Sequence, residues 1–487
     1  MIMISVYLRE QKRYTQKELL KIFVCSEEKL DLIFSKLKEF GILKIVRKSS
    51  SQLNMSNLVD EYIEIVPVEA ICKDCYYVFI FVGILIVAGR ILKCYPKYLC
   101  SVDNPIKELR VVCKVIEKYS SKEQIIYMLN DYTGNSSFNL LAVLLFLMHD
   151  YFENGIYNNS KNILEVNGSG EVLWDKTINE TFSIFSNNRP YYIEMQTKKR
   201  VNDDFDYFKR LHECILTLIS KELMEADLLS LFELTPIDLT DEYLYEFGDR
   251  EYILYRIENE LNIEFNTRKQ LVLKGIYAYI KHGGQLDYRD GISSFGTNSF
   301  NLVWECVCSE ILNNQLDIPL GQLRLPVPLN KEYNSQTKLI NLIEKPFWSI
   351  FEKEAKETLI PDLITIFKNQ FYIFDAKYYT PNLKHGESPK GQPGIESISK
   401  QYLYQLAYKK FIDTHGFEGV KNCFLLPTED DTIICLGEVS MKMFSNLGLE
   451  NIKVRCIPAN IAYDYYLLGK KLDINMLKLN NKDCYNR

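Results

Sequence analysis

The sequence predicts a multidomain protein of mixed α/β and α+β class, and three observations support this prediction. The chain has 487 residues, of which 47% are hydrophobic, so it is long enough for several domains with ordinary cores. Segments with helical spacing of apolar residues alternate with short runs of aromatic and β-branched residues, which are typical of strands. A loop rich in Gly and Ser near residue 290 indicates a domain boundary. We predict domains at 1–58, 59–290 and 291–487.

The first predicted domain, residues 1–58, contains two helix starts. Thr15 and Glu18 form a capping box, and Ser26 begins a second amphipathic helix that ends at Gly41. The strand ILKIV follows directly. Two short helices, a tight turn and a strand fit a winged helix-like module. Residues 1–50 hold 11 Lys and Arg against 6 Asp and Glu, which is compatible with DNA contact and equally with protein docking.

The second predicted domain, residues 59–290, combines strands and helices. Its apolar run CYYVFIFVGILIVAG has fifteen residues, fewer than the ~20 that a membrane-spanning helix needs, so we predict buried strands that bend at Gly83. We also predict a core helix over 138–148 and a hairpin turn over 167–170. Residues 221–264 are strongly acidic, which indicates a solvated face or a surface for a basic protein partner. We predict no transmembrane segment and no membrane partner.

Charge and cysteine content limit the function classes. The net charge of −6 gives no overall attraction for nucleic acid, so DNA contact has to come from local patches. No G-x-x-x-x-G-K-[ST] motif occurs, so the chain carries no P-loop of its own. Thirteen cysteines without a signal-peptide pattern indicate free thiols and a cytoplasmic location. The irregular spacing of Cys72, Cys75, Cys94 and Cys100 favours packed apolar side chains over a zinc site.

The third predicted domain, residues 291–487, carries the clearest chemistry in the segment PDLITIFKNQFYIFDAKYY. Two strand-forming runs are joined there by a turn. A two-residue loop at 368–369 places Asp362 opposite Asp375, with Cβ atoms ~4.5–5.5 Å apart. A loop shifted by one residue places Asp362 opposite Lys377 instead. In both registers the three side chains share one face of the sheet.

Two carboxylates at this separation require a cation. They repel each other by roughly 3 kcal/mol at an effective dielectric of about 20, and Lys377 offsets only part of this energy. A hard divalent ion, which oxygen ligands bind at ~2.0–2.1 Å, offsets the rest. The alternative is an ordinary Asp–Lys ion pair on an exposed strand. A Pro-Asp, a single hairpin step and a D-x-K after an apolar strand together are much more specific than D-x-K alone.

This combination resembles the PD-(D/E)xK nuclease superfamily, with Asp362, Asp375 and Lys377 at the motif positions. The resemblance implies a nuclease core of mixed sheet flanked by helices, which hydrolyses phosphodiester bonds with an Mg²⁺-activated water, Mn²⁺ being an alternative ion. It also implies that Asp362 and Asp375 hold the metal with the main-chain carbonyl of Ala376. Lys377 would orient the water or stabilise charge on the phosphate.

Members of this superfamily often place an acidic residue on a helix ahead of the motif. In SFNLVWECVCSEIL, Asn301, Glu305 and Ser309 form a polar stripe at four-residue spacing. We therefore expect Glu305 in the catalytic and metal site, rather than Glu310, which lies off that stripe. Exposure of the stripe to water is the alternative.

Members also commonly carry a Gln on the helix after the motif. Gln401 and Gln405 lie one turn apart in SKQYLYQLAYKKF, and the sequence does not decide which of them reaches the site. The spacing from Gln405 to Tyr408 departs from the usual Q-x-x-x-Y. An exposed helix face is the alternative for both. We expect His385, in the preceding Pro/Gly-rich loop, to be solvated rather than a general base.

More narrowly, the chain resembles the LlaJI family of restriction endonucleases, which is related to the McrC nuclease subunit. DAKYY followed by KQYLYQLAYKKF carries the likeness most specifically, over 298–411, and YPKYL with NGSGEVLWDKTI carries it more loosely over 77–180. In that family the nuclease works with a separate McrB-like GTPase that translocates DNA. The resemblance implies a type II or McrBC-like restriction endodeoxyribonuclease that acts on double-stranded DNA in phage defence, with residues 59–290 docking the motor.

Two other functions stay open. One is a stand-alone DNA repair or recombination nuclease on the same core, which would need no GTPase. The other is a non-catalytic winged-helix DNA-binding or scaffolding protein with a vestigial nuclease core. The intact Asp362, Asp375 and Lys377 argue against the second alternative.

Overall fold

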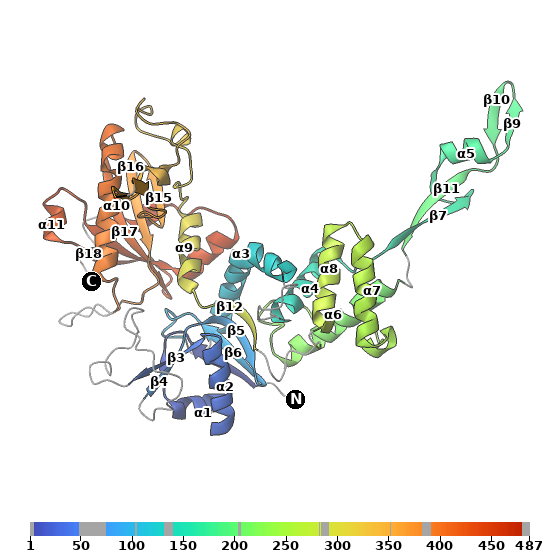
Figure 1. Cartoon of the computed structure of the whole chain (residues 1–487), viewed down its shortest axis with the longest axis horizontal. Coiled ribbons are helices and arrows are strands. Elements are labelled where there is room, and N and C mark those ends of the chain that lie inside the picture. Colours follow the sequence, from blue (N-terminus) through green and yellow to red (C-terminus); the bar gives the residue numbers. More distant parts are fainter. Residues whose placement is uncertain are drawn as a thin grey trace. The chain divides into compact units, whose positions relative to one another are not determined.

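The computed structural model describes residues 4–47, 75–102, 105–130, 140–202, 206–281, 283, 292–350, 352–381 and 391–479. The chain forms two compact units, one made of residues 1–125 with 289–487 and the other of residues 126–288. Both units contain helices and strands, which confirms the mixed class (Figure 1). The three-domain division stays a prediction. No helix in the described part of the chain is long and apolar enough to cross a membrane.

The N-terminal region of the first unit contains the two expected helices. Thr15 N–H donates to Glu18 Oε2 at 2.7 Å and Glu18 N–H donates to Thr15 Oγ1 at 3.3 Å, which confirms the capping box. Ser26 caps the second helix. The winged-helix assignment stays a prediction, because residues 48–74 lie outside the described residues. The elements are β1 (Ile4–Arg9), β2 (Arg13–Tyr14), α1 (Gln16–Phe23), α2 (Glu27–Glu39), β3 (Leu43–Arg47) and β4 (Cys75–Phe79).

A four-stranded sheet in the order β1-β6-β5-β12 follows, built with β5 (Val82–Val87), β6 (Arg90–Tyr95) and β12 (Ile292–Thr297). Gly83 has φ +132°, and a Cβ there would lie 2.1 Å from the Phe295 carbonyl oxygen, which explains the glycine at the predicted bend. Cys75 and Cys94 are buried in an apolar cluster, as predicted, whereas Cys100 is exposed, contrary to the prediction of a packed side chain. Cys72 lies outside the described residues. The described cysteines other than Cys435 are free, but Cys435 is disulfide-bonded, contrary to the expectation of free thiols. Helix α3 (Ile106–Asn130) comes next.

The second unit combines packed helices with a β-ribbon. The predicted core helix is present as α4 (Leu140–Asn154), which packs with α6 (Tyr207–Glu225) and α8 (Thr267–Lys281). The predicted hairpin over 167–170 is wrong, because β7 and β8 do not pair with each other but both pair with β11. The remaining elements are β7 (Ser160–Val166), β8 (Glu171–Val172), α5 (Trp174–Glu180), β9 (Ser183–Ser186), β10 (Arg189–Tyr192), β11 (Gln196–Asn202), the 3-10 helix η3 (Leu244–Phe247) and α7 (Arg250–Ile263).

The C-terminal region of the first unit is built on a five-stranded mixed sheet in the order β15-β16-β17-β19-β18. β16, β17 and β19 run parallel, while β15 and β18 pair antiparallel at the two edges. The elements are α9 (Phe300–Ile311), β13 (Phe347–Trp348), β14 (Lys353–Glu354), β15 (Leu363–Phe367), β16 (Gln370–Ala376), α10 (Ile395–Thr414), β17 (Gly419–Thr428), β18 (Ile434–Val439), α11 (Lys442–Ser445), β19 (Ile452–Pro458) and α12 (Ala459–Leu467); short 3-10 helices lie at η4 (Leu320–Gln322), η5 (Leu339–Leu342) and η6 (Ile474–Leu477).

Helices cover this sheet and direct alternate residues of β16 to different neighbours. Phe371 and Ile373 pack with Tyr404 and Tyr408 of α10. The even-numbered residues of β16 point away from α10. Tyr378, which continues this even-numbered series just after the strand, contacts Phe300 of α9. Asp375 therefore shares the α10 side of β16 with an otherwise apolar core.

Candidate active site

The β15–β16 hairpin sets the geometry of the predicted motif. Phe367 pairs with Gln370 across a loop formed by Lys368 and Asn369, whose φ values are 47° and 58°. Two consecutive positive φ angles are typical of a type I′ turn, whose twist matches that of a hairpin. The first of the two predicted registers is confirmed, and the register shifted by one residue is wrong. Continuing the observed pairing by one step places Asp362 opposite Asp375.

The structure brings the three motif side chains together. Ala376 N–H donates to Asp362 Oδ2 at 2.8 Å, which holds the Asp362 carboxylate against the end of β16. Lys377 Nζ lies 3.0 Å from Asp375 Oδ1. Asp375 is only 3% exposed, whereas the Lys377 side chain is 22% exposed. The Lys377 ammonium group thus contacts the buried carboxylate of Asp375 and is itself partly exposed to solvent.

Burial and mutual repulsion govern the charge state of the carboxylate pair. Burial, followed by the hydrogen bond and the negative charge of Asp375, raises the pKa of Asp362 to about 9. Glu305 contributes in the same direction and Lys377 opposes it. Burial by itself would lower the pKa of Lys377, but Asp375 and Asp362 outweigh this effect and raise it. These effects favour the protonated carboxyl at Asp362 and the charged ammonium group at Lys377.

Glu305 of α9 lies within electrostatic reach of the pair. Burial raises its pKa, Asp375 adds to the shift, and Lys377 and a hydrogen bond with Asn301 oppose it. Glu310 is instead exposed and lies 3.6 Å from Lys118 Nζ. No group of three or more His, Cys, Asp or Glu side chains gathers closely enough to hold a metal within the described residues. Glu305 is thus near the site without completing a cluster of three carboxylates.

The two candidate glutamines occupy different environments. Gln401 is fully buried, its Nε2 donates to the Ile373 carbonyl at 3.0 Å, and its Oε1 has no hydrogen-bond partner. Gln405 Oε1 accepts hydrogen bonds from Asn422 Nδ2 at 2.8 Å and Glu450 N–H at 3.2 Å. Both glutamines are buried, so the exposed helix face is wrong for them.

The direction of α10 places Gln401 nearer to the carboxylates. Tyr408 packs on Phe371, with ring centroids 5.4 Å apart. Burial, and then the charges of Asp375 and Asp362, raise the pKa of Tyr404. The chain direction of α10 is therefore opposite to that of β16: Tyr408 lies beside the start of β16 and Tyr404 lies nearer to its end. Gln401, which precedes Tyr404, thus lies toward the end of β16 that carries the motif.

The sequence analysis missed two residues that support the site. Asn314 Nδ2 donates to Ser309 Oγ at 3.0 Å and to the Asp362 carbonyl at 3.4 Å, while its Oδ1 accepts from Ile364 N–H at 3.1 Å. Trp304 Nε1 and Lys377 N–H both donate to the Leu425 carbonyl, at 3.1 and 2.9 Å. The Asn-Asn-Gln run after α9 is a turn signal, but nothing in the sequence indicates which strand it contacts.

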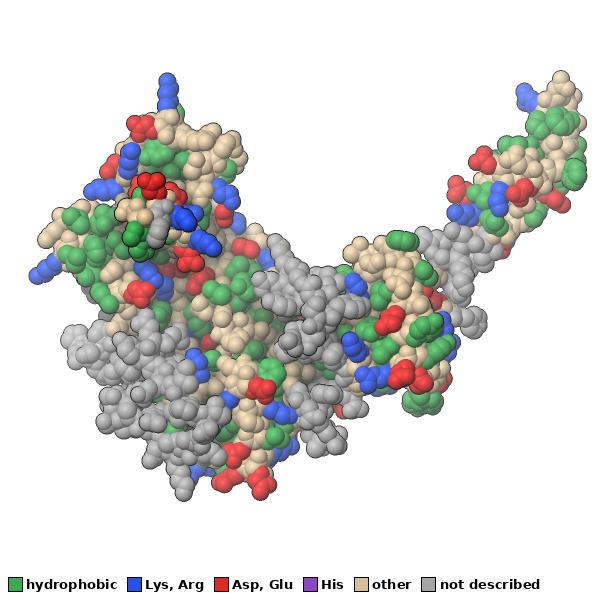
Figure 2. Space-filling model, viewed as in Figure 1, with side chains coloured by type: hydrophobic (Ala, Val, Ile, Leu, Met, Phe, Trp, Pro, Cys, Tyr) green, Lys and Arg blue, Asp and Glu red, His purple; other side chains and the backbone are tan. Residues whose placement is uncertain are grey.

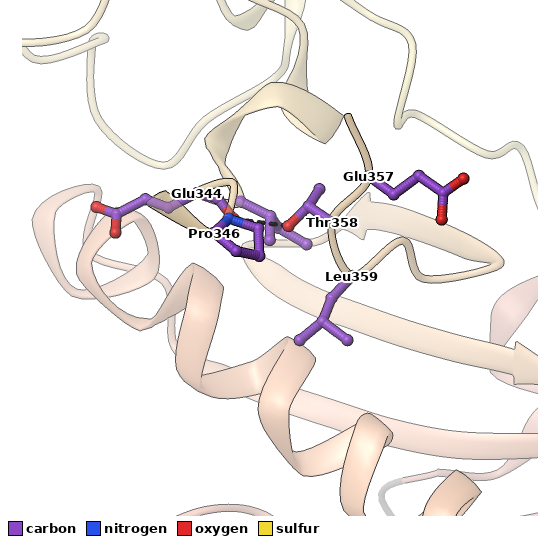
Figure 3. A pocket seen from close by; sticks show the side chains of 6 residues that line it. Glu344, Pro346, Glu357, Thr358 and Leu359 are labelled. Atoms are coloured by element: carbon purple, nitrogen blue, oxygen red, sulfur yellow. Dashed lines mark hydrogen bonds between the residues drawn. The ribbon is translucent and has the colours of Figure 1, made fainter. Parts of the chain in front are cut away.

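A pocket of about 380 Å³ lies in the segment before β15. Thr358 Oγ1 donates to the Glu344 carbonyl at 2.6 Å beside it, and the carboxylates of Glu344 and Glu357 point away from it (Figure 3). Its lining contains no predicted site residue and consists of Ile343, Glu344, Pro346, Glu357, Thr358 and Leu359. The pocket is therefore separate from the carboxylate pair. His385 lies outside the described residues, so its predicted solvation stays a prediction.

Two solved structures are weakly similar to the chain. A solved half-complex of Thermococcus gammatolerans McrB AAA+ hexamers with bound McrC matches 96% of this chain and 99% of that chain, at 12% identity and a TM-score of 0.38. A structure of the McrBC complex from the same organism matches 62% of this chain and 84% of that chain, at 12% identity and a TM-score of 0.25. These TM-scores are too low to establish a shared fold.

Sequence comparison is more informative. The "Type II restriction enzyme BsuMI component YdjA" of Bacillus subtilis (strain 168) is 26% identical over 411 residues, which cover 81% of each protein. The model of the LlaJI restriction endonuclease family matches residues 81–461, which include every predicted catalytic residue. Because this match spans most of the sequence, the chain belongs to the LlaJI restriction endonuclease family.

Proposed function

We propose that the chain is the Mg²⁺-dependent DNA endonuclease subunit of a bacterial restriction system. Membership of a restriction endonuclease family supports a nuclease. The observation that carries the proposal is the meeting of Asp362 and Asp375 at the end of one hairpin, with Lys377 Nζ 3.0 Å from Asp375. A structural ion pair would need only one carboxylate, whereas here a second one, Asp362, lies beside Asp375, and burial with the hydrogen bond and charge of Asp375 raises its pKa.

The donor set fits a hard divalent cation. Asp362, Asp375 and Glu305, with the carbonyl oxygen of Ala376, would hold Mg²⁺ or Mn²⁺. Burial, and then the hydrogen bond and charge of Asp375, raise the pKa of Asp362, so a cation between the two carboxylates would stabilise their ionised forms. Mg²⁺ usually keeps several water ligands and binds through one or two carboxylates, so it does not require a cluster of three protein side chains. When bound, Mg²⁺ supplies Lewis-acid stabilisation of a phosphate oxygen.

The other roles belong to side chains of the chain itself. Lys377 donates hydrogen bonds from its ammonium group, which orients the attacking water or stabilises charge on the phosphate. Asp375 holds that ammonium group in place through the 3.0 Å contact. The unpartnered Oε1 of Gln401 is a free acceptor on the same side of the sheet. A bound cation would favour the ionised form of Asp362, because its positive charge would compensate both the burial and the repulsion that raise the pKa of this carboxyl.

The proposed substrate is double-stranded DNA. Figure 2 shows acidic and basic side chains interspersed over the visible faces of the described residues, rather than one continuous basic surface. This agrees with the net charge of −6 and favours local contacts with phosphate over attraction by the whole molecule.

We also propose a separate McrB-like GTPase as the partner. The sequence contains no P-loop motif, which agrees with a nucleotide-driven motor on a separate protein. Residues 59–290 are the proposed docking region. Its ribbon presents Phe182 at 97% exposure and Phe185 at 71%, and hydrophobic side chains gather over β9 and β10 (Figure 2). Exposed apolar surface of this kind is typical of protein–protein contacts.

A plasmid cleavage assay with the full chain, Mg²⁺, GTP and the co-encoded GTPase tests this function. We expect Asp375→Ala and Lys377→Ala each to abolish cleavage, while Lys368→Ala, at the exposed turn of the same hairpin, cuts like wild type. Retained cleavage by either of the first two variants would refute the assignment. Equal cleavage without GTP and the GTPase would instead identify a stand-alone nuclease.

A further inference from the structure

We propose that Tyr378 and Glu10 form a positioning pair that fixes the backbone of Lys377 and so the place of its ammonium group. The inference rests on the proposed function, since it adds two residues to the same active site. Neither residue belongs to the PD-(D/E)xK motif. Glu10 lies in the turn after β1, far from the motif in the sequence.

The phenol oxygen of Tyr378 is a junction of three segments. Its hydroxyl donates a hydrogen bond to Glu10 Oε2. Lys97 N–H donates both to Glu10 Oε2 and to the Tyr378 oxygen, each at 3.2 Å. Tyr378 is 5% exposed and Glu10 is 4% exposed. A carboxylate buried at this depth is retained only where hydrogen bonds and positive charge compensate it.

The ring of Tyr378 is enclosed on several sides. Lys97 Nζ lies 4.5 Å from the ring centroid and also donates to Gln11 Oε1 at 2.9 Å. Tyr98 packs edge-on at 6.3 Å between ring centroids, and Phe300, the first residue of α9, packs at 5.3 Å. A ring held by a cation and two aromatic neighbours has one place for its hydroxyl group.

These contacts restrain Lys377 from both sides. Lys377 N–H donates to the Leu425 carbonyl at 2.9 Å, which extends the β16–β17 ladder one residue beyond Ala376. The next residue, Tyr378, is fixed by Glu10. Because the backbone is anchored at Lys377 N–H and at the Tyr378 side chain, the Lys377 side chain leaves the chain at a fixed point and direction. Alternation then directs it to the side of Asp375.

The same anchor reaches the helix that carries Glu305. Trp304 Nε1 donates to the Leu425 carbonyl that also accepts from Lys377 N–H. Phe300 contacts the Tyr378 ring one helical turn earlier. Displacing Tyr378 therefore disturbs Lys377 directly and α9 through packing. A small displacement of a catalytic group lowers the rate of the chemical step more than it lowers substrate binding.

Steady-state cleavage kinetics of the full chain with its GTPase partner test this role. Tyr378→Phe keeps the ring and removes only the hydroxyl, and we expect kcat to fall roughly tenfold or more with KM for DNA unchanged. Glu10→Ala should cause the same loss, and Glu10→Gln, which keeps an acceptor oxygen, should restore most of it. The double variant Tyr378→Phe with Glu10→Ala should be no slower than the slower single variant.

Tyr408→Phe is the matched control. Tyr408 is also buried and donates a hydrogen bond to the Leu339 carbonyl at 3.2 Å, but it packs on Phe371, near the turn of the hairpin and away from the Tyr378 ring. We expect the thermal stability of this variant to fall while its kcat stays near the wild-type value. Equal kcat for Tyr378→Phe and wild type, or equal losses for Tyr408→Phe and Tyr378→Phe, would overturn the positioning role. Absence of cleavage by the wild-type chain would overturn the proposed function itself.

Discussion

Asp362 and Asp375 lie opposite each other at the end of the β15–β16 hairpin, and Asp362 Oδ2 accepts a hydrogen bond from the N–H of Ala376, next to Asp375. This relationship joins two acidic groups thirteen residues apart in the sequence at one end of the sheet. Burial, followed by the hydrogen bond and the charge of Asp375, raises the pKa of Asp362, and the opposing effect of Lys377 is smaller. The properties of the site follow from this close pairing of two acidic side chains.

The first prediction concerns stability without metal. The folded pKa of Asp362 is raised above its unfolded value, so its protonated form stabilises the fold at low pH and this stabilisation is lost as the pH rises. In EDTA, we expect wild-type stability to fall between about pH 4, the ordinary Asp range, and about pH 9. Asp362→Asn, which mimics the protonated acid, should lose less stability over this window.

Urea unfolding at several pH values measures this difference. Asp317→Asn, at an exposed aspartate of the same unit, is the control and should follow the wild-type curve. Parallel pH profiles for Asp362→Asn and wild type would show that Asp362 carries no retained proton.

The second prediction separates the two acidic residues of α9. Glu305→Gln removes a charge that acts on Asp362, so we expect the Mg²⁺ concentration for half-maximal cleavage to rise roughly tenfold. Glu310→Gln, five residues further along α9 and exposed, should leave this Mg²⁺ concentration unchanged. A titration of cleavage against Mg²⁺ checks both variants. Equal midpoints for Glu305→Gln and wild type would remove Glu305 from the site.

The third prediction distinguishes the glutamines of α10. Gln405→Leu removes the oxygen that accepts from both Asn422 Nδ2 and Glu450 N–H and leaves Asn422 Nδ2 only its longer bond to the Glu450 carbonyl, so unfolding free energy should fall by about 1–3 kcal/mol while kcat stays near wild type. Gln401→Leu removes the unpartnered oxygen and should lower kcat instead. Chemical denaturation and cleavage kinetics of both variants show which glutamine acts in the site. A loss of kcat in Gln405→Leu and not in Gln401→Leu would assign the active-site role to Gln405.

The fourth prediction tests the support of Asp362. Asn314→Ala leaves Ile364 N–H without its acceptor and frees the backbone at Asp362, so unfolding free energy should fall by about 1–3 kcal/mol. Cleavage should also need more Mg²⁺ as Asp362 moves. Asn341→Ala, at an exposed asparagine, is the control and should change neither quantity. An unchanged Mg²⁺ requirement in Asn314→Ala would show that Asp362 is held without it.

Local sequence signals predicted the hairpin and the side chains it brings together. Period-two alternation and the turn at Lys368 and Asn369 allowed two registers, and the positive φ angles of both residues show which one forms. Alternation alone then places Asp375 and Lys377 on one side. The hairpin and the shared face depend only on residues close to one another in the sequence, and they could therefore be predicted from it.

Long-range contacts could not be predicted in the same way. Leu425 receives hydrogen bonds from Trp304 and Lys377, and Gln401 rather than Gln405 lies toward the motif, because α10 runs back along β16. The hairpin predicted over 167–170 failed for a similar reason. Turn residues indicated a reversal, but β11, from later in the chain, provides the pairing partner for both strands.

The central claim is that Asp362 and Asp375 together bind one divalent cation. A crystal structure of the full chain grown with Mn²⁺, with diffraction data collected to locate anomalous scattering, tests it most directly. We expect one strong peak between these two carboxylates, next to the Ala376 carbonyl, and its loss in Asp375→Asn. A wild-type crystal with Mn²⁺ elsewhere, or with no peak at the pair while the same protein cleaves DNA, would contradict the claim.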